Sequence, residues 1–264
     1  MMIWTQQRLI DRRRWLALSA AVMVPAGSRA APADRGLAVT SVLELFTSQS
    51  CSSCPPADAL FCSLVREPGT LALSLPVTIW DHLGWKDTLA QPAFSRRQKD
   101  YARQRGDRAI YTPQVVVNGV LHAGGSDLGA ITEARRDSRR PGVMALGVDL
   151  IGTGDRWRVT IAPGGREGTV LLVPFERSRT VAIGRGENSG RTNRYANVVR
   201  SLVPIGRYRG EALALTLSAD AVADAGQSFA ILVQDGDLNA PGAILGAAEA
   251  PRLIIQIAVA EAVT

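Results

Sequence analysis

Residues 43–56 read LELFTSQSCSSCPP, an apolar, strand-like run that ends in polar residues, two cysteines and a proline pair. Cys51 and Cys54 therefore lie at the predicted start of a helix. Free backbone N–H groups and the positive end of the helix dipole favour a thiolate on the first cysteine there. The second cysteine can close onto the first and release a substrate held as a mixed disulfide. The stretch predicts a redox pair in which Cys51 attacks and Cys54 resolves.

The apolar pattern on both sides of the cysteines predicts an α/β fold. Strands are expected at 37–46, 71–80, 109–117 and 120–123, and helices at 57–66, 91–105 and 127–140. Asn118-Gly119 supplies the turn between the last two strands. This order is that of a thioredoxin-like domain, which we assign to residues 31–142.

The second half of the chain has a different pattern, with short apolar runs divided by glycine-rich turns. Strands are predicted at 143–151, 156–162, 169–175, 212–217, 229–234 and 253–259. Such spacing is typical of a mainly antiparallel, β-sandwich-like domain, assigned here to residues 143–264. The polar, arginine-rich stretch 185–208 is predicted to be a loop.

Residues 1–30 resemble a signal peptide. They contain a basic stretch, an apolar run at 15–24 and small residues at 25–30. The apolar run is shorter than the roughly 20 residues that span a membrane, although an uncleaved anchor is the alternative. Asp11-Arg12-Arg13-Arg14 also resembles a twin-arginine signal. We therefore expect a periplasmic or secreted protein with no stable membrane span after signal cleavage, in a compartment where disulfides persist.

Composition limits the classes of function. The chain has 264 residues, 46% of them hydrophobic, which is enough for a sizeable core, and its 3 cysteines form no disulfide framework. The net charge of +6 comes largely from the leader, because residues 31–264 carry 25 basic and 23 acidic side chains. A nearly neutral mature chain with scattered charges lacks the basic surface of a nucleic-acid binder.

A second motif, Tyr111-Thr112-Pro113-Gln114, is predicted to face the cysteines. An X–Pro bond is the only kind for which the cis form costs little, and a proline at the first position of a strand loses no needed N–H. We expect Thr112 and Pro113 to shape a substrate surface, and the alternative is a trans proline that only begins a strand. Trp80, Trp85 and Tyr111 are candidate walls of a substrate groove or, alternatively, core residues.

Three further residues bear on the site. Glu44 is a charge inside an apolar strand, so we expect either a buried proton shuttle for Cys54 or an edge residue that faces water. Asp58 in the first helical turn would oppose thiolate formation if it lay close to Cys51. Cys62 lies eight residues beyond Cys54, about 12 Å along a helix, whereas a disulfide needs Cα atoms within about 7 Å. Cys62 is therefore predicted to be an unpaired, buried thiol.

No cofactor or metal is expected. Two thiolates with His82 and His122 would suit copper or zinc, but their spacing carries little signal. Proline follows Cys54 where c-type haem attachment needs histidine.

Four motifs occur in order and carry a resemblance to a known family. They are residues 44–49 (ELFTSQ), 51–60 (CSSCPPADAL), 83–87 (LGWKD) and 111–114 (YTPQ), with weaker matches at 185–188 and 197–200. The chain is similar to a bacterial family of exported thioredoxin-like proteins catalogued only as a domain of unknown function. The resemblance implies a thioredoxin-like fold with an added β-rich region, and it names no substrate. Ser50 departs from the glycine expected before the first cysteine.

These observations predict an exported thiol–disulfide oxidoreductase that uses Cys51 and Cys54. Its partners would be exported proteins or small thiols and disulfides. The alternative from another class is a non-catalytic binding or chaperone-like module with a static disulfide, or one that carries copper or zinc.

Overall fold

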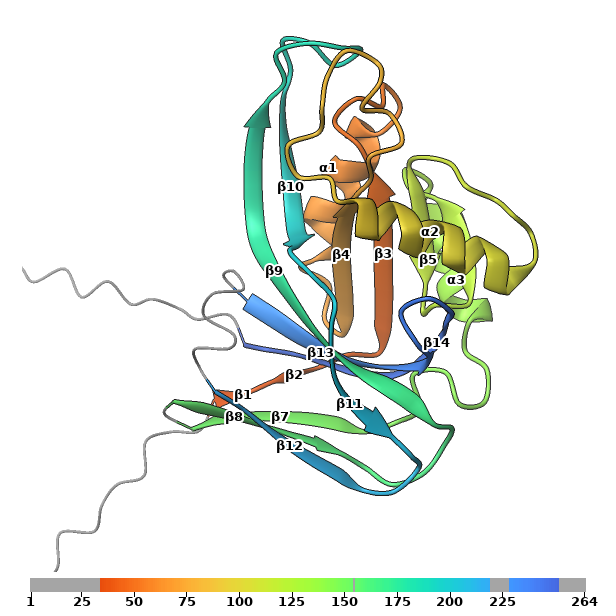
Figure 1. The fold of residues 1–264 in the computed structure, drawn as a ribbon, viewed down its shortest axis with the longest axis vertical. Helices are drawn as coiled ribbons and strands as arrows, with labels where there is room; N and C mark the ends of the chain where they lie inside the picture. The colour runs from red at the N-terminus through yellow and green to blue at the C-terminus, as the bar shows by residue number, and fades with distance from the viewer. Residues whose placement is uncertain (1–33, 154, 219–227, 252–264) are drawn as a thin grey trace, which may run out of the picture. The chain divides into compact units, whose positions relative to one another are not determined.

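Ten strands form one mixed sheet that runs through most of the molecule (Figure 1). The computed structural model describes residues 34–153, 155–218 and 228–251, so the predicted signal peptide and the predicted strand 253–259 lie outside the described residues. In sheet order the strands are β2 (Leu37–Ala38), β14 (Pro241–Glu249), β13 (Ser228–Gly236), β9 (Gly168–Ala182), β10 (Thr192–Val199), β4 (Thr70–Pro76), β3 (Ser41–Thr47), β5 (Gln114–Val117) and β6 (Leu121–Gly124). The tenth strand, β11 (Val203–Tyr208), pairs with β9.

Strands β3 and β4 form the parallel centre of the half of the sheet that carries the cysteines. Every residue of both strands is buried. Near-continuous burial is expected for parallel strands that are covered on both faces. This confirms the strand predicted before the cysteines and the strand predicted after the first helix.

Three helices are described, and local sequence signals explain their ends. α1 (Pro55–Leu64) and α2 (Pro92–Arg105) begin with proline, which needs no N–H partner in the first turn. Gly106 ends α2 in the left-handed conformation at φ 77°, and the Asp127 side chain caps α3 (Leu128–Asp137) by accepting a hydrogen bond from Ala130 N–H. All three helices were predicted.

Successive side chains of a strand point to opposite faces of the sheet, so alternate residues of β3 contact different helices. In β3, Leu43 and Leu45 pack with α1 and α3, whereas Val42 and Phe46 pack with α2 on the opposite face. The α2 face continues across β9 and β13 as one core.

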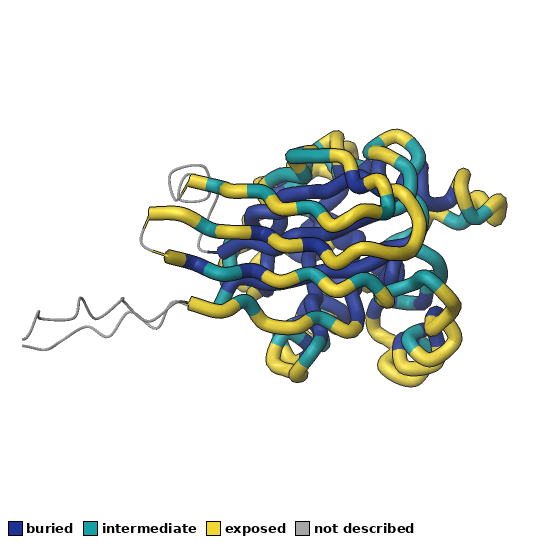
Figure 2. The backbone as a smooth tube through the Cα atoms, turned by 90° about the horizontal axis from the view of Figure 1, so that it is seen from below, coloured by how far each residue is buried: buried dark blue, intermediate teal, exposed yellow. Residues whose placement is uncertain are grey.

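A second, four-stranded sheet packs against β9, β13 and β14. Its strands, in order, are β1 (Asp34–Arg35), β7 (Val148–Thr153), β8 (Arg156–Ile161) and β12 (Leu213–Ser218). Leu150, Val159 and Ile161 lie in the buried layer between the two sheets. Figure 2 shows that the outer face of this sheet is largely exposed.

The predicted fold class is wrong. The described residues contain fourteen strands against three helices, and the large mixed sheet replaces the predicted α/β thioredoxin-like domain followed by a β-sandwich-like domain. β10 pairs in parallel with β4, with Val198 opposite Ser74, so strands from both sides of residue 142 share one hydrogen-bonded sheet. The described residues accordingly form one compact unit.

The strand β10 causes most of this difference, because it lies in the stretch 185–208 that was predicted to be a loop. Its first residues are polar and mostly exposed, and only its last five are buried. A strand that is half exposed and half buried gives no regular period-2 pattern. β14 was missed as well, since its glycines, alanines and first proline lower its β-propensity.

No helix in the described part of the chain is long and apolar enough to cross a membrane.

Candidate functional site

Cys51 and Cys54 form a disulfide in the loop between β3 and α1, with their Cα atoms 5.4 Å apart. Cys54 is the N-cap residue of α1 and is fully buried, whereas Cys51 retains 6% of its surface. Cys51 is therefore the more exposed of the two cysteines. The predicted pairing of these two cysteines is confirmed.

The Thr112 hydroxyl points at the accessible sulfur. It donates a hydrogen bond to Cys51 Sγ over 3.2 Å and accepts one from Trp80 Nε1–H over 2.7 Å. An indole N–H can only donate, so the Trp80 bond leaves the Thr112 proton free for the sulfur. Ser53 Oγ lies 3.3 Å from the same sulfur. The Thr112–Pro113 peptide bond is cis.

Trp85 supports the backbone of the disulfide loop. Its indole N–H donates to Gln49 Oε1 over 2.9 Å, and its carbonyl accepts from the Ser50 hydroxyl over 2.6 Å. Asp87 Oδ2 accepts from Gln49 N–H over 2.7 Å. Ser50 thus uses its side chain in a hydrogen bond that the expected glycine lacks. Trp80 and Trp85 are both half-buried, and their substrate-binding role stays a prediction.

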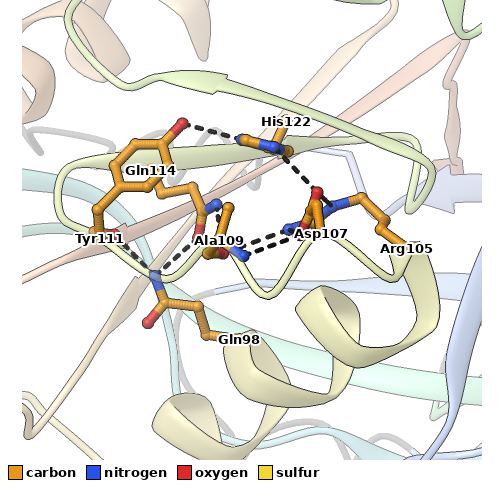
Figure 3. A network of polar contacts seen from close by, with 7 residues as sticks. All are labelled: Gln98, Arg105, Asp107, Ala109, Tyr111, Gln114 and His122. Carbon is orange, nitrogen blue, oxygen red and sulfur yellow. Dashed lines mark hydrogen bonds and ion pairs between the residues drawn. The ribbon is translucent and has the colours of Figure 1, made fainter.

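Tyr111 is tied to a polar chain on the hairpin beside it (Figure 3). Its hydroxyl lies 2.9 Å from His122 Nδ1, and His122 Nε2 lies 3.1 Å from Asp107 Oδ2. The hydrogen bond from Arg105 lowers the pKa of Asp107 to about 2. Burial and the nearby Arg105 charge lower the pKa of His122. A neutral His122 then donates to Asp107 and accepts from Tyr111, so it joins Tyr111 to its hairpin.

Among the described residues, no group of three cysteine, histidine or acidic side chains is placed to hold a metal ion. His82 packs near the Trp80 ring with centroids 6.2 Å apart. His122 uses both ring nitrogens within the polar chain.

Glu44 lies on the wrong face of the sheet for the predicted proton shuttle. Its neighbours Leu43 and Leu45 pack against α1, and Glu44 between them points to α2. There its carboxylate forms a buried ion pair of 2.7 Å with Arg97 and accepts a hydrogen bond from the Tyr101 hydroxyl. The structure therefore does not bring Glu44 to the cysteines.

Asp58 is a buried carboxyl on the side of the sheet that carries the disulfide. It lies one turn along α1 from Cys54, whose carbonyl accepts the Asp58 N–H over 3.1 Å. The Thr47 hydroxyl donates to Asp58 Oδ1 over 2.8 Å, and Oδ2 has no hydrogen-bond partner among the described residues. Burial raises the pKa of Asp58 well above its usual value. A neutral Asp58 would not oppose a Cys51 thiolate, contrary to the concern raised by its sequence position.

The loop between β9 and β10 completes the site from a distant part of the chain. Asn188 Nδ2 donates to both Gln49 O and Cys51 O, over 2.9 and 2.8 Å, and Asn188 is 1% exposed. Glu187 Oε2 accepts from Ser52 N–H over 3.2 Å. Figure 1 shows this loop and the end of β3 at the same end of the sheet. We name Glu187 and Asn188 the clasp.

Sequence reasoning did not assign the clasp to the site. Residues 185–188 were noticed only as part of the family resemblance. A glycine next to two side chains that can bind backbone groups was the available signal, and Gly186 has a positive φ of 79°.

The family and structure comparisons each cover most of this chain. The model of a family described as "Protein of unknown function (DUF1223)" matches residues 42–234. A crystal structure of a protein from Agrobacterium tumefaciens is similar with 30% identity and a TM-score of 0.73, covering 83% of this chain and 97% of that one.

A more distant structure, HBP35 of Porphyromonas gingivalis, has 11% identity and a TM-score of 0.52, with 86% of this chain and 82% of that chain covered. It supports the fold alone. No curated protein matches this chain.

Proposed function

We propose, from the premise that this chain belongs to the DUF1223 family of proteins of unknown function, that it is an exported thiol–disulfide oxidoreductase. One observation carries the proposal: the accessible sulfur of a closed C-x-x-C disulfide receives a hydrogen bond from Thr112. A hydrogen bond to sulfur is stronger when the sulfur is a thiolate, so it stabilises the reactive and leaving form of Cys51.

The proposed reaction is a two-electron exchange. A substrate thiolate attacks Cys51 Sγ, the Cys51–Cys54 bond breaks, and the electron pair leaves on Cys54. A second substrate thiolate then attacks the substrate sulfur of the mixed disulfide and releases Cys51 as a thiolate. Two substrate thiols become a disulfide while the protein gains two electrons and two protons. The reverse sequence reduces a substrate disulfide.

Asp58, in place of Glu44, is our candidate for the proton that Cys54 needs. Cys54 is fully buried, so a thiolate left on it is poorly solvated. A raised carboxyl pKa keeps a proton available one helical turn away. We propose that Asp58 protonates the leaving Cys54 and recovers the proton when the disulfide re-forms.

Exposed apolar side chains support a polypeptide substrate. Leu83, Ile110 and Leu128 are 37%, 40% and 48% exposed. Leu83 lies in the loop between Trp80 and Trp85, and Ile110 lies two residues before Thr112. Leu128 begins α3 just after Gly125, whose N–H donates to the Pro113 carbonyl. An extended chain with apolar side chains beside its cysteine would bury these surfaces.

Redox titration tests the proposal. The purified protein is equilibrated with mixtures of reduced and oxidised glutathione, and the fraction of closed disulfide is read by alkylation and mass. A reversible transition is expected, with a thiol pKa for Cys51 below the ordinary value of about 8.5. Cys62→Ser is the control that leaves only the pair.

Trapping identifies the partner. Cys54→Ser should hold mixed disulfides with exported proteins, whereas Cys51→Ser should hold none. A Cys51–Cys54 bond that does not exchange, together with an ordinary Cys51 pKa, rules out catalysis.

A further inference from the structure

A pocket of about 400 Å³ lies where the C-terminal end of α1 meets β9 and β10. It is lined by Cys62, Val65 and Arg66 of α1 and its C-terminal end, Arg177 and Ser178 of β9, and Arg194, Ala196 and Asn197 of β10. Three arginines from three elements therefore face one small space. None of these residues takes part in the disulfide site described above.

One of the three arginines is neutralised within the protein. Arg177 Nη1 forms an ion pair of 3.0 Å with Glu249, and its Nη2 donates to Ser228 Oγ and to the Ala250 carbonyl. Arg177 is thereby fixed as part of the pocket wall. It adds no uncompensated charge.

The other two arginines have no carboxylate within 4.0 Å among the described residues. Arg66 donates through Nε to the Cys62 carbonyl over 3.1 Å, and Arg194 donates through Nε to Ser178 Oγ over 2.9 Å. A single bond at Nε orients the planar guanidinium and leaves its two Nη groups for another acceptor. This fork matches the two oxygens of a carboxylate or phosphate group.

We propose that this pocket binds a small oxyanion, whose carboxylate or phosphate group is held by the free Nη groups of Arg66 and Arg194. The bound group offsets two like charges that line the same space and that otherwise repel each other. Arg177, with Glu249 beside it, closes one wall. A volume of about 400 Å³ lies in the range of small-molecule sites in proteins.

Cys62 is a built-in reporter of this pocket. It is the free cysteine of the chain and is half-buried, with Sγ donating to the Arg194 carbonyl over 3.6 Å. Burial raises the pKa of Cys62, while the charges of Arg194 and Arg66 lower it. Both arginine charges therefore act on this one thiol. Since Cys51 and Cys54 are joined, the oxidised protein offers Cys62 alone to an alkylating reagent.

The test compares alkylation of oxidised protein by neutral iodoacetamide and by anionic iodoacetate. The ratio of the two rates is used, because a change in thiol pKa affects both reagents equally. We expect the Arg66→Gln/Arg194→Gln double variant to lower the anionic-to-neutral ratio about three- to tenfold, the effect of one or two nearby charges in a largely solvated site. Arg103→Gln, an exposed arginine paired with Asp100 on α2, is the matched control and should leave the ratio unchanged.

Ligand protection distinguishes the two sources of oxyanion. At constant ionic strength, inorganic phosphate in one arm and succinate in the other should slow alkylation by neutral iodoacetamide with saturation in the wild type and not in the double variant. The stronger protector shows whether the site prefers a phosphate or a carboxylate. An unchanged reagent ratio in the double variant, or no saturable protection by either anion, overturns the proposal.

Discussion

We expect Asn188 of the clasp to contribute strongly to stability, although it is far in sequence from the disulfide loop that it contacts. Asn188→Ala removes the Nδ2 group that donates to the Gln49 and Cys51 carbonyls. Both acceptors belong to buried residues of the disulfide loop, where water cannot easily replace the lost donor. The loop would then keep its hydrogen bonds with Trp85 and Asp87, with Glu187 of the clasp and with Thr112.

The magnitude follows from the two lost bonds. Leaving the buried Gln49 carbonyl without its donor costs about 1–3 kcal/mol, whereas the Cys51 carbonyl keeps its bond from Cys54 N–H over 3.2 Å, so the bond that it loses costs about 0.5–1.5 kcal/mol. Removal of the Asn188 Oδ1 atom, which has no partner among the described residues, returns part of this. We expect a net loss of about 2–3 kcal/mol in the free energy of unfolding. The midpoint of thermal unfolding should fall by roughly 4–12 °C.

The assay is urea unfolding of oxidised wild-type and variant protein, followed by tryptophan fluorescence. Asn193→Ala is the matched control, because Asn193 lies on the adjoining strand β10 and its side chain makes, among the described residues, a single long bond of 3.5 Å to Tyr195 Oη. It should change stability by less than about 0.5 kcal/mol. If Asn188→Ala is equally mild, the clasp does not stabilise the disulfide loop and the reasoning fails.

Three further substitutions test the roles of Asp58, Glu44 and Thr112. Because burial raises the folded pKa of Asp58 above its unfolded value of about 4, wild-type stability should fall as pH rises from about 4 toward the folded pKa. Asp58→Asn should flatten that fall and be the more stable protein at pH 7 in urea unfolding; parallel pH profiles would contradict this. Glu44→Gln strips Arg97 of its ion-pair partner and should cost about 3–5 kcal/mol. The reduction potential of the disulfide should be the same in that variant as in the wild type. A shifted potential would support the sequence-based hypothesis that Glu44 carries a proton for Cys54. Thr112→Val removes the hydrogen bond to Cys51 and should raise the pKa of that thiol by about one unit, measured from the pH dependence of alkylation; an unchanged pKa would show that the hydroxyl does not stabilise the thiolate.

Local patterns in the sequence were sufficient to predict the cysteine pair, the elements on either side of it and the position of Thr112. The apolar run before Cys51 forms β3, and the proline pair after Cys54 begins α1. Thr112 lies against Cys51 as the spacing of the two motifs indicated. These signals depend on few neighbouring residues, so a single sequence displays them.

The roles of the two buried acids could not be assigned from the local sequence. Glu44 and Asp58 are both carboxyls close in sequence to the cysteines, and sequence favoured the first as the proton carrier. Alternation in β3 directs Glu44 to Arg97 on the α2 face, whereas Asp58 shares a helix with Cys54. A residue's face becomes known only when the sheet and its covering helices are placed.

By itself, the sequence determined the cysteine pair, the helix starts and the buried strands β3 and β4. The tertiary structure alone decided that strands from both halves of the chain share one mixed sheet, because β10 pairs with β4 over more than a hundred residues of separation. It also decided that Asn188 holds the loop of Cys51. The β10–β4 pairing joins backbone groups, and Asn188 binds backbone carbonyls that every residue has. Neither contact therefore requires a particular partner side chain that the sequence would reveal.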